Sequence, residues 1–309
     1  MRLPLQVSAV LSAIVLSFCT APVSAFNYTL PTTPTKWGEG PNSASMGPLG
    51  TPGSATWSVM GPGVNPTPIN SIRTDSFYDP HINGFNTSAT TTDFTTLLTA
   101  PAGDEIAMIN AALNLWDIES GFKNLGPVAD GNVNFGAVGA VGGSLGDIRI
   151  GAIALDGPSS LGGTLLAHSF QPGVEGLFTT GTGTAIPGGT ILGDIHLDSS
   201  ELWIDNPSAT ATTLGYDLFT VLLHELGHAL GLGHSSDPSS VMYANYTGAH
   251  RTLSADDIAG ITYLYGPQPA TGSTVPEPGT LTLLGLGLAG LVAGVRLTKR
   301  AANGAPYTH

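Results

Sequence analysis

One stretch decides both the fold and the chemistry of this 309-residue chain: residues 224–234, which read HELGHALGLGH. On a helix, His224 and His228 are four residues apart, so both imidazoles project from one face and can bind one ion. Gly231 can adopt a positive φ, which ends the helix and turns the chain back so that His234 becomes the third ligand. Three protein ligands with one open position are typical of a catalytic zinc site rather than a structural one.

The residue after the first histidine has the chemistry of a general base. Glu225 is rotated by about 100° from His224 on the helix, so it can reach a water on the ion without being a ligand itself. Zinc lowers the pKa of such a water to about 7, and Glu225 would accept its proton as the water attacks a peptide carbonyl. The alternative is a set of histidines with purely structural roles, which would require five fixed positions to coincide by chance.

These residues resemble the zinc-binding motif of the metzincins, and Ser235 after the third histidine narrows the resemblance to the matrixins, the matrix-metalloproteinase family. Three other stretches are similar to that family: residues 193–198 (GDIHLD), 240–243 (SVMY) and 253–258 (LSADDI). The resemblance covers residues 55–266. It implies an α+β, metzincin-like fold: a twisted mixed sheet with two long helices, one carrying the zinc motif, and a C-terminal helix after the Met-turn.

The resemblance also assigns two residues downstream of the histidines. Met242 matches the methionine of the Met-turn, which forms an apolar floor beneath the zinc. Tyr246 matches a tyrosine that shapes the pocket for the substrate residue following the scissile bond. Ala244 replaces the proline that the family has in this region, so the resemblance predicts no particular specificity.

Further metal sites are implied by the resemblance alone. Asp156, Asp198 and Glu201 match carboxylates of a calcium site, and Ca²⁺ prefers such hard oxygen ligands; ordinary solvated carboxylates are the alternative. His168 and His196 match two of the four ligands of the family's structural zinc. The stretch where the other two ligands would lie offers none, so we expect a vestigial second site and one tightly bound zinc.

Composition limits the partners and the compartment. A net charge of −13 with only nine Lys and Arg argues against nucleic-acid binding. Residues 1–25 have the charged start, apolar stretch and small-residue cleavage site of a signal peptide; a membrane anchor is the alternative, but the stretch is short. Cleavage would remove Cys19, the only cysteine. The mature chain would then lack the propeptide cysteine that keeps the family latent.

The C-terminal region has a separate character. Residues 275–278 read VPEP, and residues 280–297 are apolar and unbroken by charge until Arg296, which begins a basic cluster with Lys299 and Arg300. This order resembles the PEP-CTERM sorting signal of Gram-negative bacteria, which implies membrane insertion, processing by an exosortase-type enzyme and release to the cell surface or extracellular matrix. Residues 280–297 also have the length of a short transmembrane helix. A permanent single-span anchor is the alternative.

The remaining chain is predicted to form short elements between loops. Helices are expected at residues 103–122, 216–230 and 254–265, the last capped by Ser254. The first of them should bury Ile106, Ile109, Ala112, Leu113 and Trp116. Strands are expected at residues 55–60, 133–135, 147–153, 165–170 and 191–197. The expected organisation is a signal peptide (1–25), a Pro/Gly/Ser/Thr-rich segment (26–54), a metalloprotease domain (55–266), a linker (267–278), a sorting signal (275–300) and a tail (301–309).

We therefore predict a secreted zinc metalloendopeptidase that hydrolyses extracellular proteins or peptides, with zinc and calcium as cofactors. The alternative from another class is a non-catalytic surface or matrix protein on the same scaffold, which would not need Glu225. A serralysin-type protease is a third reading, disfavoured by Ser235 and by the missing glycine-rich Ca²⁺ repeats.

Overall fold

The computed structural model describes the chain in separate ranges: residues 35–39, 44–45, 48–64, 90–98, 105–132, 145–155, 157–158, 165–172 and 193–269. The chain divides into two compact units, Met1–Gln268 and Pro269–His309. The architecture below is that of the first unit.

A five-stranded mixed sheet forms the centre of this unit, in the order β4-β3-β5-β7-β6. The four parallel strands are β3 (Gly53–Val59), β4 (Phe122–Pro127), β5 (Ile148–Ile153) and β7 (Ile195–Asp198). The edge strand β6 (Ala167–Ser169) pairs with β7 in the antiparallel direction. All six residues of β5 are buried, as expected for an inner strand of a parallel array that is covered on both faces.

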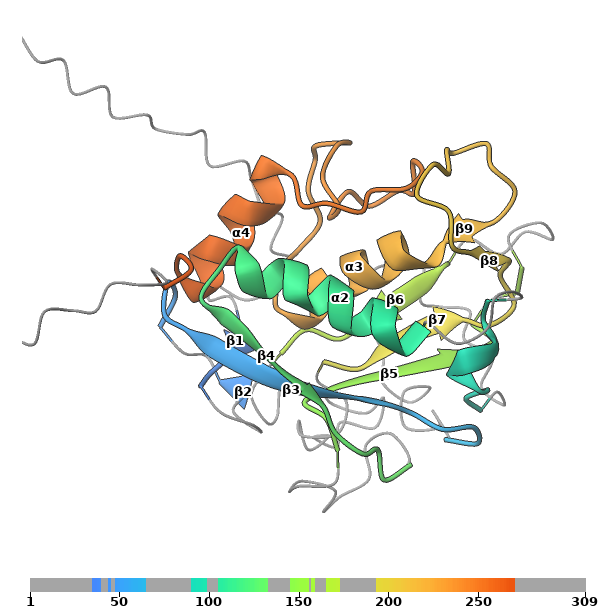
Figure 1. Ribbon diagram of the computed structural model, residues 1–309, viewed down its shortest axis with the longest axis horizontal. Coiled ribbons are helices and arrows are strands. Elements are labelled where there is room, and N and C mark those ends of the chain that lie inside the picture. The colour runs from blue at the N-terminus through green and yellow to red at the C-terminus, as the bar shows by residue number, and fades with distance from the viewer. Residues whose placement is uncertain are drawn as a thin grey trace, which may run out of the picture. The chain divides into compact units, whose positions relative to one another are not determined.

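Two helices lie side by side across one face of this sheet (Figure 1). They are α2 (Glu105–Ile118) and α3 (Leu218–Ala229). The Trp116 indole of α2 donates a 3.2 Å hydrogen bond to the Leu223 carbonyl of α3, so the two helices are joined by a buried polar contact as well as by packing. The predicted α+β fold with a mixed sheet and two long helices is confirmed.

The third helix, α4 (Ala255–Tyr265), begins as the sequence predicts. The Ser254 side chain accepts from the Asp257 amide, and Asp257 accepts from the Ser254 amide, which completes a capping box. Shorter elements accompany these: β1 (Lys36–Trp37) pairs with β2 (Ala44–Ser45), β8 (Trp203–Ile204) pairs with β9 (Tyr216–Asp217), and η2 (Phe94–Thr96) is a 3-10 turn.

Four of the expected strands correspond to β3, β5, β6 and β7, and the expected strand at residues 133–135 lies outside the described residues. Strand β4 was not predicted. Its sequence, FKNLGP, contains Gly and Pro, and after buried Phe122 its residues are alternately exposed and half-buried. An edge strand of this kind lacks the run of apolar residues by which inner strands are identified.

Helix α2 ends earlier than predicted and buries a different residue. It stops at Ile118, three residues before Gly121. Ile106 was expected in the buried stripe but is 37% exposed, whereas Met108 is 8% exposed and packs in the core. Gly121 serves a different purpose, because a Cβ there would lie 2.1 Å from the Tyr265 carbonyl oxygen. The turn after α2 is therefore pressed against the end of α4.

Part of the segment before residue 55 packs in the core of this unit. Trp37 is 3% exposed, and its indole donates a 2.8 Å hydrogen bond to the carbonyl of Ala229, the last residue of α3. Its amide donates to the Tyr265 hydroxyl at 3.1 Å. Residues 35–37 consequently support the C-terminal ends of two helices.

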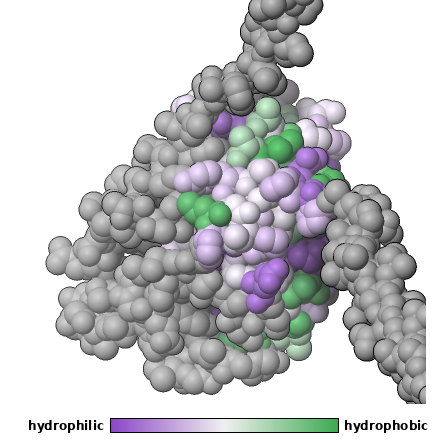
Figure 2. Space-filling view, turned by 90° about the vertical axis from the view of Figure 1, so that its left-hand side faces the viewer, coloured by the Kyte–Doolittle hydropathy of each residue, from purple (hydrophilic) through white to green (hydrophobic). Residues whose placement is uncertain are grey.

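The sequence predicts a transmembrane helix, and the described part of the chain corrects that prediction. Across the described ranges, no helix is long and apolar enough to cross a membrane. Helix α2 has 14 residues, which corresponds to about 21 Å, whereas a hydrocarbon core is about 30 Å thick. The apolar stretch itself lies outside the described residues. On the face of the molecule shown in Figure 2, the described surface is mainly hydrophilic or neutral, and its hydrophobic residues form small separate groups.

Candidate metal centre

Helix α3 carries the first two histidines and is fixed at its start by Asp217. The Asp217 side chain accepts a 3.1 Å hydrogen bond from the Thr220 amide, the arrangement of an N-cap. The helix starts at Leu218 rather than at residue 216, because Tyr216 and Asp217 pair with β8 as strand β9.

Three histidines meet at the C-terminal half of this helix. One ring nitrogen from each of His224, His228 and His234 lies within 4.8 Å of the others. Nδ1 of His224 is 2.7 Å from the Val241 carbonyl oxygen, and Nδ1 of His228 is 2.8 Å from that of Leu232. Because a carbonyl can only accept, each Nδ1 carries the proton and each Nε2 keeps a free lone pair. This is the tautomer that metal-binding histidines adopt.

The return of the chain to the third histidine depends on Gly231. Its φ is 109°, and a Cβ there would lie 2.3 Å from the Thr35 carbonyl oxygen. Both the left-handed conformation and the lack of space require glycine. The ring of His234 then lies with its centroid 4.7 Å from that of His228 and 5.4 Å from that of His224.

The surroundings favour neutral imidazoles. Burial, with a smaller contribution from the charge of His234, lowers the pKa of His224 to about 4. Burial lowers the pKa of His228 well below its ordinary value, with His224 and His234 contributing in the same direction. At neutral pH both rings are thus in the form that binds a metal ion.

The Met-turn lies directly against α3. Met242 is fully buried, and a Cβ at Gly227 would lie 2.3 Å from its sulphur. The side chain therefore packs under the helix turn that joins His224 to His228, where an apolar floor was expected.

A buried carboxylate that the sequence did not single out for this purpose holds the Met-turn. Asp257 accepts hydrogen bonds from the Val241 amide (2.9 Å), the Met242 amide (3.2 Å) and the Ser240 hydroxyl (2.5 Å). From sequence it is identifiable only as an acidic residue in the first turn of α4. Its contacts with residues 15 to 17 positions away have no local sequence signal.

Ser235 ties the third histidine to the same structure. Its hydroxyl donates to Asp256 at 2.5 Å, and its amide donates to the Met242 carbonyl at 2.8 Å. The chain after His234 is thus bonded both to the Met-turn and to α4.

Glu225 and Tyr246 also lie on or beside α3. Glu225 follows His224 on the helix and is 5% exposed. The Tyr246 hydroxyl accepts a 3.0 Å hydrogen bond from the Asp217 amide, and its ring meets that of Tyr216 edge to face with centroids 5.2 Å apart. Tyr246 therefore lies at the start of α3, two turns before the histidines.

Two of the candidate calcium residues share one turn after β7. Asp198 is fully buried and Glu201 is 9% exposed. One oxygen of Asp198 accepts from the amide of Ser200 at 2.8 Å and from its hydroxyl. Asp156 lies outside the described residues. Within the described part of the chain, one group of three or more His, Cys, Asp or Glu residues is placed to hold a metal ion, and it consists of the three histidines.

His168 and His196 face each other across β6 and β7. They are direct cross-strand partners, and His196 Nδ1 lies 2.8 Å from His168 Nε2, a hydrogen bond between two buried rings. Burial lowers the pKa of His168 to about 3 and that of His196 well below its ordinary value. One neutral ring therefore donates to the other.

Comparison with known proteins agrees with this geometry. A helix with two histidines, a glycine turn to a third and a buried methionine beneath them are features of the metzincin class. Residues 107–266, just over half of the chain, match the family model for matrixin, so the chain belongs to the matrixin family. Residues 274–300 match the PEP-CTERM protein-sorting motif. Both resemblances that the sequence suggested are confirmed.

Over the matched regions, individual relatives share about two residues in five with this chain. It is 41% identical to human neutrophil collagenase over 130 residues, which cover 40% of this chain and 22% of that protein. It is 38% identical to human matrilysin over 164 residues (52% and 49%), and 46% identical to human matrix metalloproteinase-20 over 118 residues (37% and 19%). The matched region spans half or less of the length of these relatives.

Proposed function

We propose that this chain is a zinc-dependent endopeptidase that hydrolyses peptide bonds of extracellular proteins. The observation that carries the proposal is the meeting of His224, His228 and His234, with Glu225 on the same helix. The relatives named collagenase and matrilysin support a protein substrate.

The donor set fits zinc. Three imidazoles, two of them neutral and fixed by carbonyl groups so that Nε2 faces away from that bond, are a ligand set that zinc takes in catalytic sites. His224, His228 and His234 would hold the ion. Zinc bound there would acidify a water ligand and polarise the substrate carbonyl.

The chain's own residues would carry the remaining steps. Glu225 would accept the proton of the attacking water and transfer it to the leaving amine. Glu225 is 5% exposed, so bulk water has little access to this carboxylate. Asp257, through the Met-turn, and the carbonyls of Val241 and Leu232 would keep the histidine rings in place during turnover.

Calcium is proposed as a second, structural cofactor. The ligands would be Asp156, Asp198 and Glu201. The pairing of β5 with β7 supports this, since Ile153 lies opposite Asp198 and the chain therefore leaves β5 beside the turn that carries the two other carboxylates.

The sorting motif implies export and targeting to the cell surface, with processing by an exosortase. We propose that residues 1–25 are a signal peptide, that residues 55–266 form the peptidase domain together with the packed residues 35–37, and that the host is a Gram-negative bacterium. Intact-mass measurement of the extracellular form tests the processing, which should remove residues 280–309.

Hydrolysis of casein by the purified chain, with and without a zinc chelator, tests the proposed function. Chelator-sensitive cleavage supports it. Absence of cleavage by a zinc-loaded chain would favour a non-catalytic protein on the same scaffold.

A further inference from the structure

One face of α3 is covered by the segment that follows the Met-turn. Thr220 and His224 are four residues apart and share this face. The His250 amide donates to the Thr220 hydroxyl at 2.9 Å, and the Val241 carbonyl accepts from His224. Segment 243–251 runs between these two contacts, so it borders the metal centre on one side.

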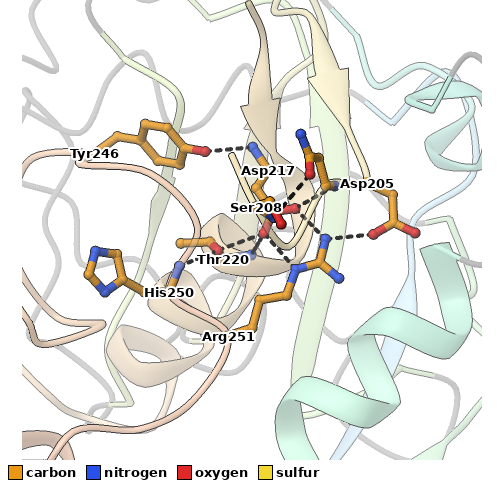
Figure 3. Close-up of polar contacts among 8 residues, drawn as sticks. Asp205, Ser208, Asp217, Thr220, Tyr246, His250 and Arg251 are labelled. Carbon is orange, nitrogen blue, oxygen red and sulfur yellow. Dashed lines mark hydrogen bonds and ion pairs between the residues drawn. The ribbon is translucent and has the colours of Figure 1, made fainter. Parts of the chain in front are cut away.

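The C-terminal end of this segment is fixed by a bidentate ion pair between Arg251 and Asp217 (Figure 3). Arg251 Nε donates to one oxygen of Asp217 at 3.0 Å, and Nη2 donates to the other. Asp217 is fully buried, and a second carboxylate, Asp205, accepts from the same Nη2 at 2.5 Å. The planar fork of arginine fits two carboxylate oxygens at once, a geometry that lysine cannot reproduce.

Asp217 holds the same segment a second time through its backbone. Its amide donates to the Tyr246 hydroxyl, while its carboxylate holds Arg251 five residues further on. Between them, the Ala249 amide donates to the Ala209 carbonyl at 2.9 Å, and Gly248 forms a bridge with Thr210. Tyr246 is thus a large aromatic side chain that is bonded itself and is followed by further bonds at Gly248, Ala249 and Arg251.

We propose that Arg251 is a positioning residue which, through Asp217, holds Tyr246 in place and so sets how large a substrate residue is accepted beside the cleaved bond. This inference rests on the proposed peptidase function. Segment 243–251 would form the wall of the substrate pocket. It has little freedom to move outward, because it is bonded at Tyr246, Ala249, His250 and Arg251. Replacing Arg251 removes the charged contact among these four bonds, so that the segment can move outward and admit bulkier substrate residues.

The test compares Arg251→Lys with Arg149→Lys. Arg149 is a matched control, because it also forms a bidentate ion pair with an aspartate, Asp130, but lies on β5 away from α3. The kcat/KM ratio is measured for peptides that differ only in having a small or a large residue after the cleaved bond. We expect Arg251→Lys to change this ratio by about fivefold or more, within the range that pocket contacts provide, and Arg149→Lys to leave it unchanged.

A readout independent of hydrolysis accompanies the ratio. Amide hydrogen exchange of zinc-loaded protein should become faster in peptides covering residues 244–252 of Arg251→Lys, and stay unchanged in peptides covering residues 221–230. If Arg251→Lys does not fold, Asp205→Asn removes the outer contact alone and should shift both readouts in the same direction by less.

Arg251→Lys that is less heat-stable yet keeps the wild-type ratio and local exchange would overturn the inference and leave Arg251 a purely structural residue. If the wild-type chain cleaves none of the peptides, the proposed function fails. The exchange measurement still decides whether Arg251 holds Tyr246, since unchanged exchange in residues 244–252 would contradict that as well.

Discussion

The sulphur of Met242 lies against the backbone of Gly227, the residue that precedes His228 on α3. A Cβ at position 227 would come within 2.3 Å of that sulphur and 3.0 Å of the Trp116 ring. The absence of a side chain at Gly227 is what allows the Met-turn to approach the helix between two of the histidines.

Gly227→Ala should therefore disturb both stability and metal binding. We expect the free energy of unfolding to fall by about 1–3 kcal/mol, because Met242 or the helix must shift to make room for the methyl group. Zinc retention should fall with it. Thermal denaturation and elemental analysis measure the two effects.

A double-mutant cycle tests the cause of that loss. Met242→Ala alone leaves a cavity and destabilises, but in the Gly227→Ala background it should cost clearly less, because it also relieves the clash. Strictly additive effects would show that the two residues do not compete for the same space.

The buried histidine pair predicts a pH dependence of stability. Burial lowers the pKa of His168 from 6.5 to about 3 in the folded chain. Between these values the unfolded chain binds more protons, so the stabilisation is complete above about pH 6.5 and is lost as the pH falls toward 3. Each such histidine contributes a slope of roughly 1.4 kcal/mol per pH unit in that window.

Denaturant unfolding of zinc-saturated protein at several pH values measures this slope. His168→Gln removes one of the titrating groups, so its free energy of unfolding should fall less steeply between pH 6 and pH 4 than that of the wild type. Parallel curves for the two proteins would contradict the assignment.

The metal content should be one tightly bound zinc per mature chain. His168 and His196 are already hydrogen-bonded to each other, and two imidazoles leave a zinc under-coordinated. His168→Ala should cost about 1–2 kcal/mol, the value of a buried hydrogen bond and its packing. Elemental analysis after dialysis against a mild chelator should find one zinc in wild type and in His168→Ala, and none in His224→Ala. Two retained zincs would contradict this.

Calcium removal should lower the melting temperature. Asp198 and Glu201 lie in one buried turn, and carboxylates that lose their cation there would repel each other. Melting curves with calcium and with a calcium-selective chelator should differ for the wild type and for Glu119→Gln, which changes an exposed glutamate at the end of α2. The difference should shrink in Glu201→Gln. Equal shifts in both variants would remove Glu201 from the proposed site.

The parts of this molecule that the sequence predicts are those with local signals. The spacing of His224, His228 and His234 around Gly231 places three ligands on one helix and the turn after it. The metal centre can therefore be predicted from eleven consecutive residues, 224–234. The cap of α4 is readable for the same reason, since Ser254 and Asp257 are three residues apart.

Contacts between distant residues were not predicted. Asp257 holds Met242 and Arg251 holds Asp217 across 15 and 34 positions, and no periodicity marks such pairs. Ile106 lies three residues before Ile109 and Met108 four residues before Ala112, so both fit the helical stripe, and only the packing of α2 against the sheet and α3 decides which is buried.

The central claim is that Glu225 acts as the base of a zinc peptidase, and Glu225→Gln tests it most directly. The ligands survive this change while the carboxylate does not. We expect one zinc per chain by elemental analysis, as in wild type, and casein hydrolysis reduced by about 100-fold or more. Glu119→Gln, the same exchange at an exposed position, should cleave at the wild-type rate. Wild-type hydrolysis by zinc-loaded Glu225→Gln would contradict the account.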